Sequence, residues 1–129
     1  MVYLVDTNVV IDALKGKRNR NAFLRSLSST ASLALCTIVT AELHAGLSSE
    51  DIAPARKFLE IVDYVSVTKT AAELAGQLLF RYKRQGISLA PQDTIIAAVA
   101  ITEGFTLVTD NLKDFPMTEL KILAPPRNQ

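Results

Sequence analysis

Short runs of apolar residues alternate along the chain with longer segments whose apolar positions recur every three or four residues. The short runs have the composition of buried strands, and the longer segments have the period of amphipathic helices. The predicted strands cover 3–5, 33–36, 64–67, 106–108 and 121–123. The predicted helices cover 9–14, 19–27, 38–46, 70–85 and 91–103, with a further helix that begins at 49 or 50 and includes 58–61.

Strands that are separated by helices predict an α/β fold with a parallel central sheet of four or five strands. Thr37 is the expected N-cap of the helix that ends at Gly46, and Pro54 is expected in the first turn of the next helix. We find no internal repeat, low-complexity segment or linker. We therefore expect residues 1–129 to form a single domain.

The composition narrows the class of protein without naming a function. Apolar residues make up 49% and charged residues 21% of 129 residues, which is typical of a globular protein. No apolar run approaches the roughly 20 residues that a membrane span needs, and the first residues do not resemble a signal peptide. The lone cysteine, Cys36, lies in an apolar run and is expected to be a buried free thiol, so we expect a reducing, cytoplasmic location.

The formal net charge of +1 conceals an uneven distribution. If four of the 13 acidic residues share one site, 14 basic residues face nine acidic ones over the rest of the surface. This imbalance mildly favours a polyanionic partner. Two basic clusters could contact RNA phosphate or be solvated helix ends: Arg81, Lys83 and Arg84 in one, and Lys15, Lys17, Arg18 and Arg20 in the other.

The counts of glycine, histidine and cysteine exclude several classes of catalytic site. The five glycines are isolated, so no glycine-rich loop binds phosphate. His44 is the only histidine, and one histidine with one cysteine cannot form a zinc site of the usual kind. No aromatic-rich stretch is present that would stack single-stranded bases. The remaining candidates for chemistry are carboxylates.

The carboxylates occupy positions that a parallel sheet brings together. Asp6 follows a buried strand, and Asp110, Asn111 and Asp114 follow the strand at 106–108. Ligands bind open parallel sheets at the carboxyl ends of strands. Glu42 and Asp93 lie on strongly apolar helices, where an unpaired charge is costly to bury.

Each acid also has an ordinary explanation. Asp6 could cap the first helix, and Asp93 could favour a helix N-terminus through the helix dipole. Glu42 could lie at a rim, and Asp114 could pair with Lys113. As a group they need a counter-charge, because no basic residue lies near Asp6, Glu42 or Asp93 in the sequence. A divalent cation would provide it.

Four motifs with acidic residues follow one another along the chain. They are Leu4-Val5-Asp6-Thr7-Asn8; Thr40-Ala41-Glu42-Leu43 with Gly46; Asp93-Thr94-Ile95-Ile96-Ala97-Ala98; and Leu107-Val108-Thr109-Asp110-Asn111 with Asp114-Phe115. In this order they resemble the PIN-domain ribonucleases, and in particular the VapC-type toxins of toxin–antitoxin pairs. The resemblance extends from Val2 to about Leu123.

The resemblance implies a three-layer α/β/α sandwich with its acids at the carboxyl edge of the sheet. Asp6, Glu42 and Asp93 fall on the most characteristic acidic positions. Asp114 is our choice for the fourth, with Asn111 assisting and Asp110 as its rival. The resemblance also makes Asn8 and Thr109 supporting hydrogen-bonding residues.

Oxygen ligands without histidine suit Mg²⁺ or Mn²⁺, one or two of which would activate water for phosphodiester cleavage. We therefore expect an endoribonuclease toxin that cleaves structured RNA such as tRNA. The alternatives are a PIN nuclease for RNA processing, an inactive RNA- or protein-binding PIN domain and, more weakly, a DNA nuclease. The resemblance further implies a cognate antitoxin and a homodimer, to which Phe58 or Tyr82 could contribute.

Overall fold

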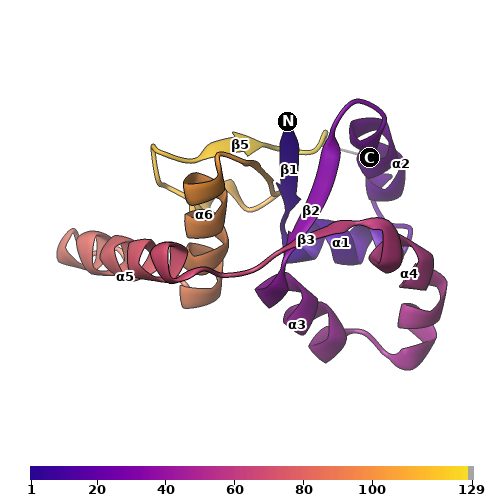
Figure 1. Ribbon diagram of the computed structural model, residues 1–129, viewed down its shortest axis with the longest axis horizontal. Coiled ribbons are helices and arrows are strands. Elements are labelled where there is room, and N and C mark those ends of the chain that lie inside the picture. The colour runs from indigo at the N-terminus through magenta and orange to yellow at the C-terminus, as the bar shows by residue number, and fades with distance from the viewer. Residues whose placement is uncertain (128–129) are drawn as a thin grey trace.

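The computed structural model describes residues 1–127 and arranges them as alternating strands and helices (Figure 1). The elements are β1 (Val2–Val5), α1 (Thr7–Leu14), α2 (Arg20–Ser28), β2 (Ser32–Cys36), α3 (Thr37–Gly46), α4 (Ser49–Ile61), β3 (Asp63–Val65), α5 (Lys69–Arg84), α6 (Pro91–Glu103), β4 (Thr106–Val108), the 3₁₀ turn η1 (Leu112–Asp114) and β5 (Lys121–Leu123). All the predicted elements are present, with ends shifted by one or two residues in most cases.

The five strands form one sheet in the order β3-β2-β1-β4-β5, and every neighbouring pair is parallel. The predicted parallel α/β sheet is therefore confirmed. The chain runs outward from β1 to β2 and β3, and then returns to place β4 on the other side of β1. In that pair, Val5 lies opposite Val108, so both strands end at the same level.

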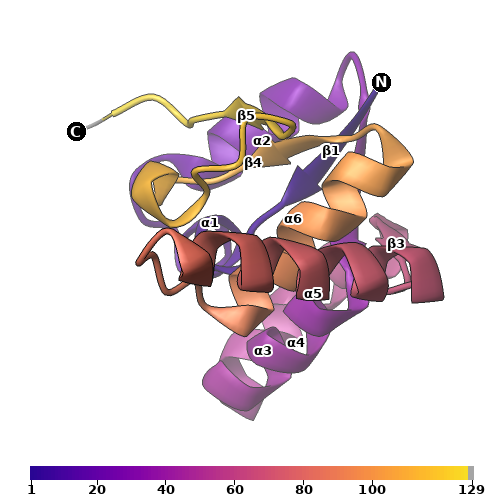
Figure 2. The same ribbon diagram turned by 90° about the vertical axis from the view of Figure 1, so that its left-hand side faces the viewer.

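Helices cover both faces of the sheet, as the strand order requires. Figure 2 shows α5 and α6 in front of the strands and α1 and α2 behind them. The short helix α3 begins where β2 ends and contacts both α1 and α6. It therefore closes the carboxyl end of the sheet between the two helical layers.

The core is aliphatic. The central strands and α6 contribute side chains that are at most 1% exposed, among them Leu4, Val5, Leu35, Ile96, Leu107 and Val108. Helix α6 is buried on several sides, and Ala97, Ala98 and Ala100 keep it narrow. Small side chains allow α5, with Ala71 and Ala75 buried, to pack closely against α6.

Two local predictions about helix ends were wrong. Helix α3 starts at Thr37 itself, and Cys36 occupies the N-cap position without a side-chain hydrogen bond. Pro54 lies in the interior of α4, because this helix begins at Ser49, as predicted, and its first turn ends before Pro54. Ser48 and Asp51 form a capping box, which satisfies two free backbone N–H groups and fixes the start of the helix at this point.

Three side chains are less accessible than the sequence analysis assumed. Tyr82 is 9% exposed and its hydroxyl donates to the Pro116 carbonyl, and Phe58 is only partly exposed and packs against the core. Arg20 is 3% exposed. Tyr82 and Phe58 are therefore poor candidates for a dimer contact, and Arg20 does not belong to a solvated basic cluster. Cys36 is a buried free thiol, as predicted.

Within residues 1–127, none of the helices combines the length and apolarity needed to cross a membrane.

Candidate metal centre at the carboxyl edge of the sheet

The chain adds strands on one side of β1 first and then, from β4 on, on the other side, so the strand order reverses between β1 and β4. The segments that leave these two strands carry acidic and amide side chains. Asp6 follows β1, while Thr109, Asp110 and Asn111 follow β4. Such a topological switch point opens a crevice outside the strand ends, where parallel sheets bind ligands. Helices α3 and α6 bring Glu42 and Asp93 to the same region. The charge of Glu42 acts on Asp6, and the charges of Asp6 and Glu42 act on Asp93.

Asp6 is the most deeply buried of these acids, with an exposed fraction of 4%. Its Oδ1 accepts a hydrogen bond of 2.8 Å from the Thr7 backbone N–H, which caps α1, and its Oδ2 accepts one of 2.8 Å from the Thr109 hydroxyl. Burial raises the pKa of Asp6, these two hydrogen bonds lower it, and the charges of Glu42 and Asp114 raise it further; the net change is upward. Asp6 thus caps α1, and this capping contact does not prevent it from serving as a carboxylate of the candidate site.

A second threonine positions Glu42. The Thr7 hydroxyl donates a hydrogen bond of 2.6 Å to Glu42 Oε1, joining the start of α1 to α3. Glu42 is partly buried on the otherwise apolar α3. The supporting polar residue predicted in this segment was Asn8, and the role of Thr7 was not predicted. Asn8 is exposed and makes no side-chain hydrogen bond within residues 1–127.

Asp93 lies in the first turn of α6, where the helix dipole favours a carboxylate. Even so, its pKa is raised from 3.8 to about 6. Burial is the largest cause, followed by the charges of Asp6, Asp114 and Glu42. A carboxyl whose ionisation is opposed by three neighbouring carboxylates is suited to a cation.

The two rivals for the fourth acid have different environments. Asp114 lies in η1 and is close enough to raise the pKa of both Asp6 and Asp93. Asp110 instead accepts a hydrogen bond of 2.8 Å from the buried Arg20 side chain. Asn111 donates its backbone N–H to the Thr109 hydroxyl at 3.1 Å, and that hydroxyl in turn donates to Asp6.

The four carboxylates Asp6, Glu42, Asp93 and Asp114 fit a divalent cation by charge and by chemistry. None of them forms an ion pair within residues 1–127. In that part of the chain, no three Asp, Glu, His or Cys side chains converge closely enough to enclose one ion. Mg²⁺ does not need such a cage, because it usually keeps several waters and binds through one or two carboxylates.

Clustered carboxylates destabilise a metal-free fold, and this gives a testable consequence for Asp93→Asn. We expect this variant to raise the free energy of unfolding in EDTA by about 2 kcal/mol at pH 7.5. Each unit by which the pKa of Asp93 is raised corresponds to about 1.4 kcal/mol, and the partial exposure of the side chain reduces the total. The folded-state pKa is raised, so the cost of ionising Asp93 develops as the pH rises from 3.8 through about 6. The gain should therefore shrink as the pH is lowered from 6 towards 4.

Urea unfolding followed by circular dichroism at pH 7.5 and pH 5.0 measures this difference. A variant that is less stable than the parent at pH 7.5, or whose gain is the same at both values, would show that Asp93 is not held among like charges.

A hollow of about 430 Å³ lies elsewhere on the molecule. It is lined mainly by α1, α2, β2 and α4, with Leu14, Leu24 and Phe58 among its apolar side chains. It contains none of the four clustered carboxylates. Its chemistry suits an apolar partner and not a phosphodiester.

Comparison with known proteins gives one family and a consistent set of relatives. The PIN domain family matches residues 3–117. Ribonuclease VapC19 of Mycobacterium tuberculosis is 31% identical over 115 residues, which covers 88% of this chain and 92% of the relative. The tRNA(fMet)-specific endonuclease VapC of Shigella flexneri is 26% identical over 117 residues, covering 88% and 89% respectively.

A solved structure of the same kind is similar over the whole fold. VapBC2 from Rickettsia felis, crystallised with a fragment of promoter DNA, has a chain that aligns with a TM-score of 0.87 and 26% identity. The alignment covers 98% of this chain and 100% of that one.

Proposed function

The chain belongs to the PIN-domain family and is an endoribonuclease of the VapC type, and we propose that it cleaves RNA with Mg²⁺ or Mn²⁺ held by Asp6, Glu42, Asp93 and Asp114. The observation that supports this site best is electrostatic. Four carboxylates gather at the switch point of the sheet, none is paired with a cation within residues 1–127, and the pKa values of Asp6 and Asp93 are raised.

The protein's own contribution is to hold the carboxylates in place. The Thr109 hydroxyl holds one carboxylate oxygen of Asp6, and the Thr7 backbone N–H at the start of α1 holds the other. The Thr7 hydroxyl orients Glu42. These hydrogen bonds leave further lone pairs on the carboxylate oxygens for a cation. When bound, Mg²⁺ supplies the positive charge that activates water and stabilises the leaving oxygen in an in-line hydrolysis. The expected products carry a 5′-phosphate and a 3′-hydroxyl.

Asn111 and Asn8 have different roles in this proposal. Asn111 lies beside Thr109 and is partly buried, so it is suited to assist at the fourth position. Asn8 is exposed at the start of α1, where it would contact substrate more readily than it would orient a ligand. Asp110 is paired with Arg20, which favours Asp114 as the fourth ligand.

We propose that the chain acts in the cytoplasm as the toxin of a toxin–antitoxin pair and cleaves structured RNA such as tRNA. The support is the similarity to a tRNA(fMet)-specific endonuclease and to a chain from a VapBC complex. A PIN nuclease for RNA processing would use the same acids and remains the alternative. An inactive binding domain is less favoured, because unpaired clustered acids cost stability that binding alone does not repay.

Two protein partners belong to this proposal. The apolar hollow between α1, α2 and α4 is suited to an apolar segment of the antitoxin, and Ile61 on its rim is 74% exposed. A homodimer would more readily use Phe80 of α5, which is 63% exposed, than Tyr82 or Phe58. Size-exclusion chromatography with light scattering, on the chain alone and with the product of the neighbouring open reading frame, tests both partners; a monomer that gains no mass would contradict them.

The nuclease proposal predicts cleavage that depends strictly on a divalent cation. Purified protein incubated with total cellular RNA should generate new 5′-phosphate ends in Mg²⁺ and none in EDTA. Sequencing of the 5′ ends then identifies the substrate and the cleavage position. Equal cleavage in Mg²⁺ and EDTA would contradict the proposed chemistry.

A further inference from the structure

A second hollow, of about 340 Å³, lies beside the acidic cluster and is lined by Arg18, Arg20, Asp110, Pro125 and Arg127. These residues come from three separate parts of the chain: the connection between α1 and α2 together with the first residue of α2, the turn after β4, and the C-terminal segment. Three guanidinium groups thus surround one carboxylate. The hollow has a net positive charge, in contrast to the acidic site next to it.

Arg20 forms the base of this hollow. One terminal nitrogen, Nη2, donates to Asp110 Oδ1 at 2.8 Å, and the other, Nη1, donates to the carbonyls of Pro126 at 3.0 Å and Arg18 at 3.2 Å. The contacts therefore tie together all three segments that line the hollow. Arg20 Nε and Asp110 Oδ2 are nevertheless buried without a hydrogen-bond partner. An unpaired buried group of this kind is costly. A phosphate oxygen can accept from the Arg20 Nε–H, whereas the carboxylate oxygen Asp110 Oδ2 needs a donor such as a water.

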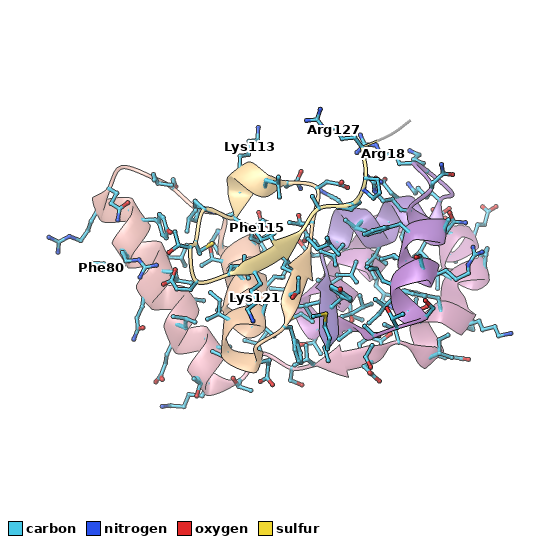
Figure 3. The ribbon with its side chains drawn as sticks, turned by 90° about the horizontal axis from the view of Figure 1, so that it is seen from above. Arg18, Phe80, Lys113, Phe115, Lys121 and Arg127 are labelled. Atoms are coloured by element: carbon cyan, nitrogen blue, oxygen red, sulfur yellow. The ribbon has the colours of Figure 1, made fainter. Side chains whose placement is uncertain are left out.

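Arg18 and Arg127 form the exposed rim. Figure 3 shows them at the same corner of the molecule, and neither is ion-paired within residues 1–127. Arg18 has a φ of 56°, which few residues other than glycine adopt. This backbone conformation allows the Arg18 carbonyl to meet Arg20 and is therefore supported by the buried contact.

From this arrangement we propose that the hollow binds a backbone phosphate of the RNA substrate, next to the phosphate that is cleaved. Arg18 and Arg127 contact the phosphate oxygens, and Arg20 holds the walls of the hollow in place. A guanidinium group presents paired N–H donors that match a phosphate in geometry and charge. The inference rests on the proposed function, because it takes the substrate to be RNA.

The position of the hollow favours RNA over an acidic protein partner. Asp110 lines the hollow and directly follows Thr109, whose hydroxyl donates to Asp6. The hollow and the acidic cluster therefore lie on either side of one short turn. The four carboxylates repel an RNA backbone, and a positive subsite beside them offsets this repulsion and positions the neighbouring phosphate.

The test uses Arg18→Ala, Arg127→Ala and the double variant, with Arg56→Ala on α4 as a matched control, since Arg56 is exposed and lies outside the hollow. Binding of bulk tRNA is measured in EDTA, where no cleavage is expected, as a function of salt. Loss of one phosphate contact should weaken binding several-fold and reduce the slope of log Kd against log salt by about one. The double variant should weaken binding by one to two orders of magnitude. Cleavage in Mg²⁺ should then show a raised KM and a nearly unchanged kcat.

The outcomes separate this inference from the proposed function. If the parent cleaves RNA in Mg²⁺ but the double variant binds tRNA like the Arg56 control, the phosphate subsite is disproved and the nuclease stands. If the double variant keeps its RNA affinity but no longer binds the antitoxin, the hollow belongs to the protein partner and the inference is also overturned. If the parent cleaves no RNA, the proposed function has failed first.

Discussion

Asp6→Asn is expected to lower the rate of RNA cleavage by on the order of 10³-fold, because a bound cation contributes several kcal/mol of charge stabilisation and each 1.4 kcal/mol is tenfold in rate. The fold should persist. The amide oxygen can still accept the Thr7 N–H, and the Thr109 hydroxyl can turn to accept from the amide NH₂. The change removes a buried charge, which is itself unfavourable in the metal-free protein.

The matched control is Asp12→Asn, an acid of α1 that is partly buried and lies outside the cluster. It should cleave RNA at the parental rate. Both variants should give circular dichroism spectra that overlay the parent. Near-parental cleavage by Asp6→Asn, with an intact spectrum, would remove Asp6 from the site.

Asp114→Asn and Asp110→Asn are expected to fail in different ways. The charge of Asp114 raises the pKa of Asp6 and of Asp93, which indicates that Asp114 belongs to the cluster. Asp114→Asn should therefore lower kcat by about 10²-fold through weaker cation binding. Asp110→Asn should keep kcat close to the parent but lose about 2–3 kcal/mol of stability, because it leaves the buried Arg20 without its counter-charge. The 18% exposure of Asp110 keeps this loss below that of a fully buried pair.

Rate measurements at saturating RNA, together with urea unfolding, distinguish the two acids. A large loss of kcat in Asp110→Asn and none in Asp114→Asn would exchange their roles. It would also mean that Arg20 releases Asp110 in the active protein.

Local sequence was sufficient to predict the features that depend on neighbouring residues. A buried strand that ends in an acid locates Asp6 at the sheet edge, and the apolar periodicity around Glu42 and Asp93 makes their charges unusual. The parallel sheet follows from the alternation of strands and helices. Local sequence also places Thr109 immediately after β4, where its hydroxyl reaches Asp6.

Features that depend on distant segments could not be predicted in the same way. Arg20 and Asp110 are 90 positions apart, and Arg20 and Pro126 are 106 apart, so the burial of Arg20 follows only from how the C-terminal segment packs. In sequence, Arg20 is indistinguishable from its basic neighbours. Thr7 was missed for the same reason, because its partner Glu42 is 35 positions away. The burial of Tyr82 depends on its contact with Pro116.

The central claim is that the acidic cluster binds the divalent cation on which cleavage depends. The most direct measurement titrates Mg²⁺ into metal-free protein and follows binding by calorimetry and RNA cleavage under the same conditions. We predict that cleavage rises over the same Mg²⁺ range in which the parent binds the ion, and that Asp6→Asn and Asp93→Asn lose both. Full Mg²⁺ binding by these two variants, or RNA cleavage by the parent before any Mg²⁺ is bound, would contradict the claim.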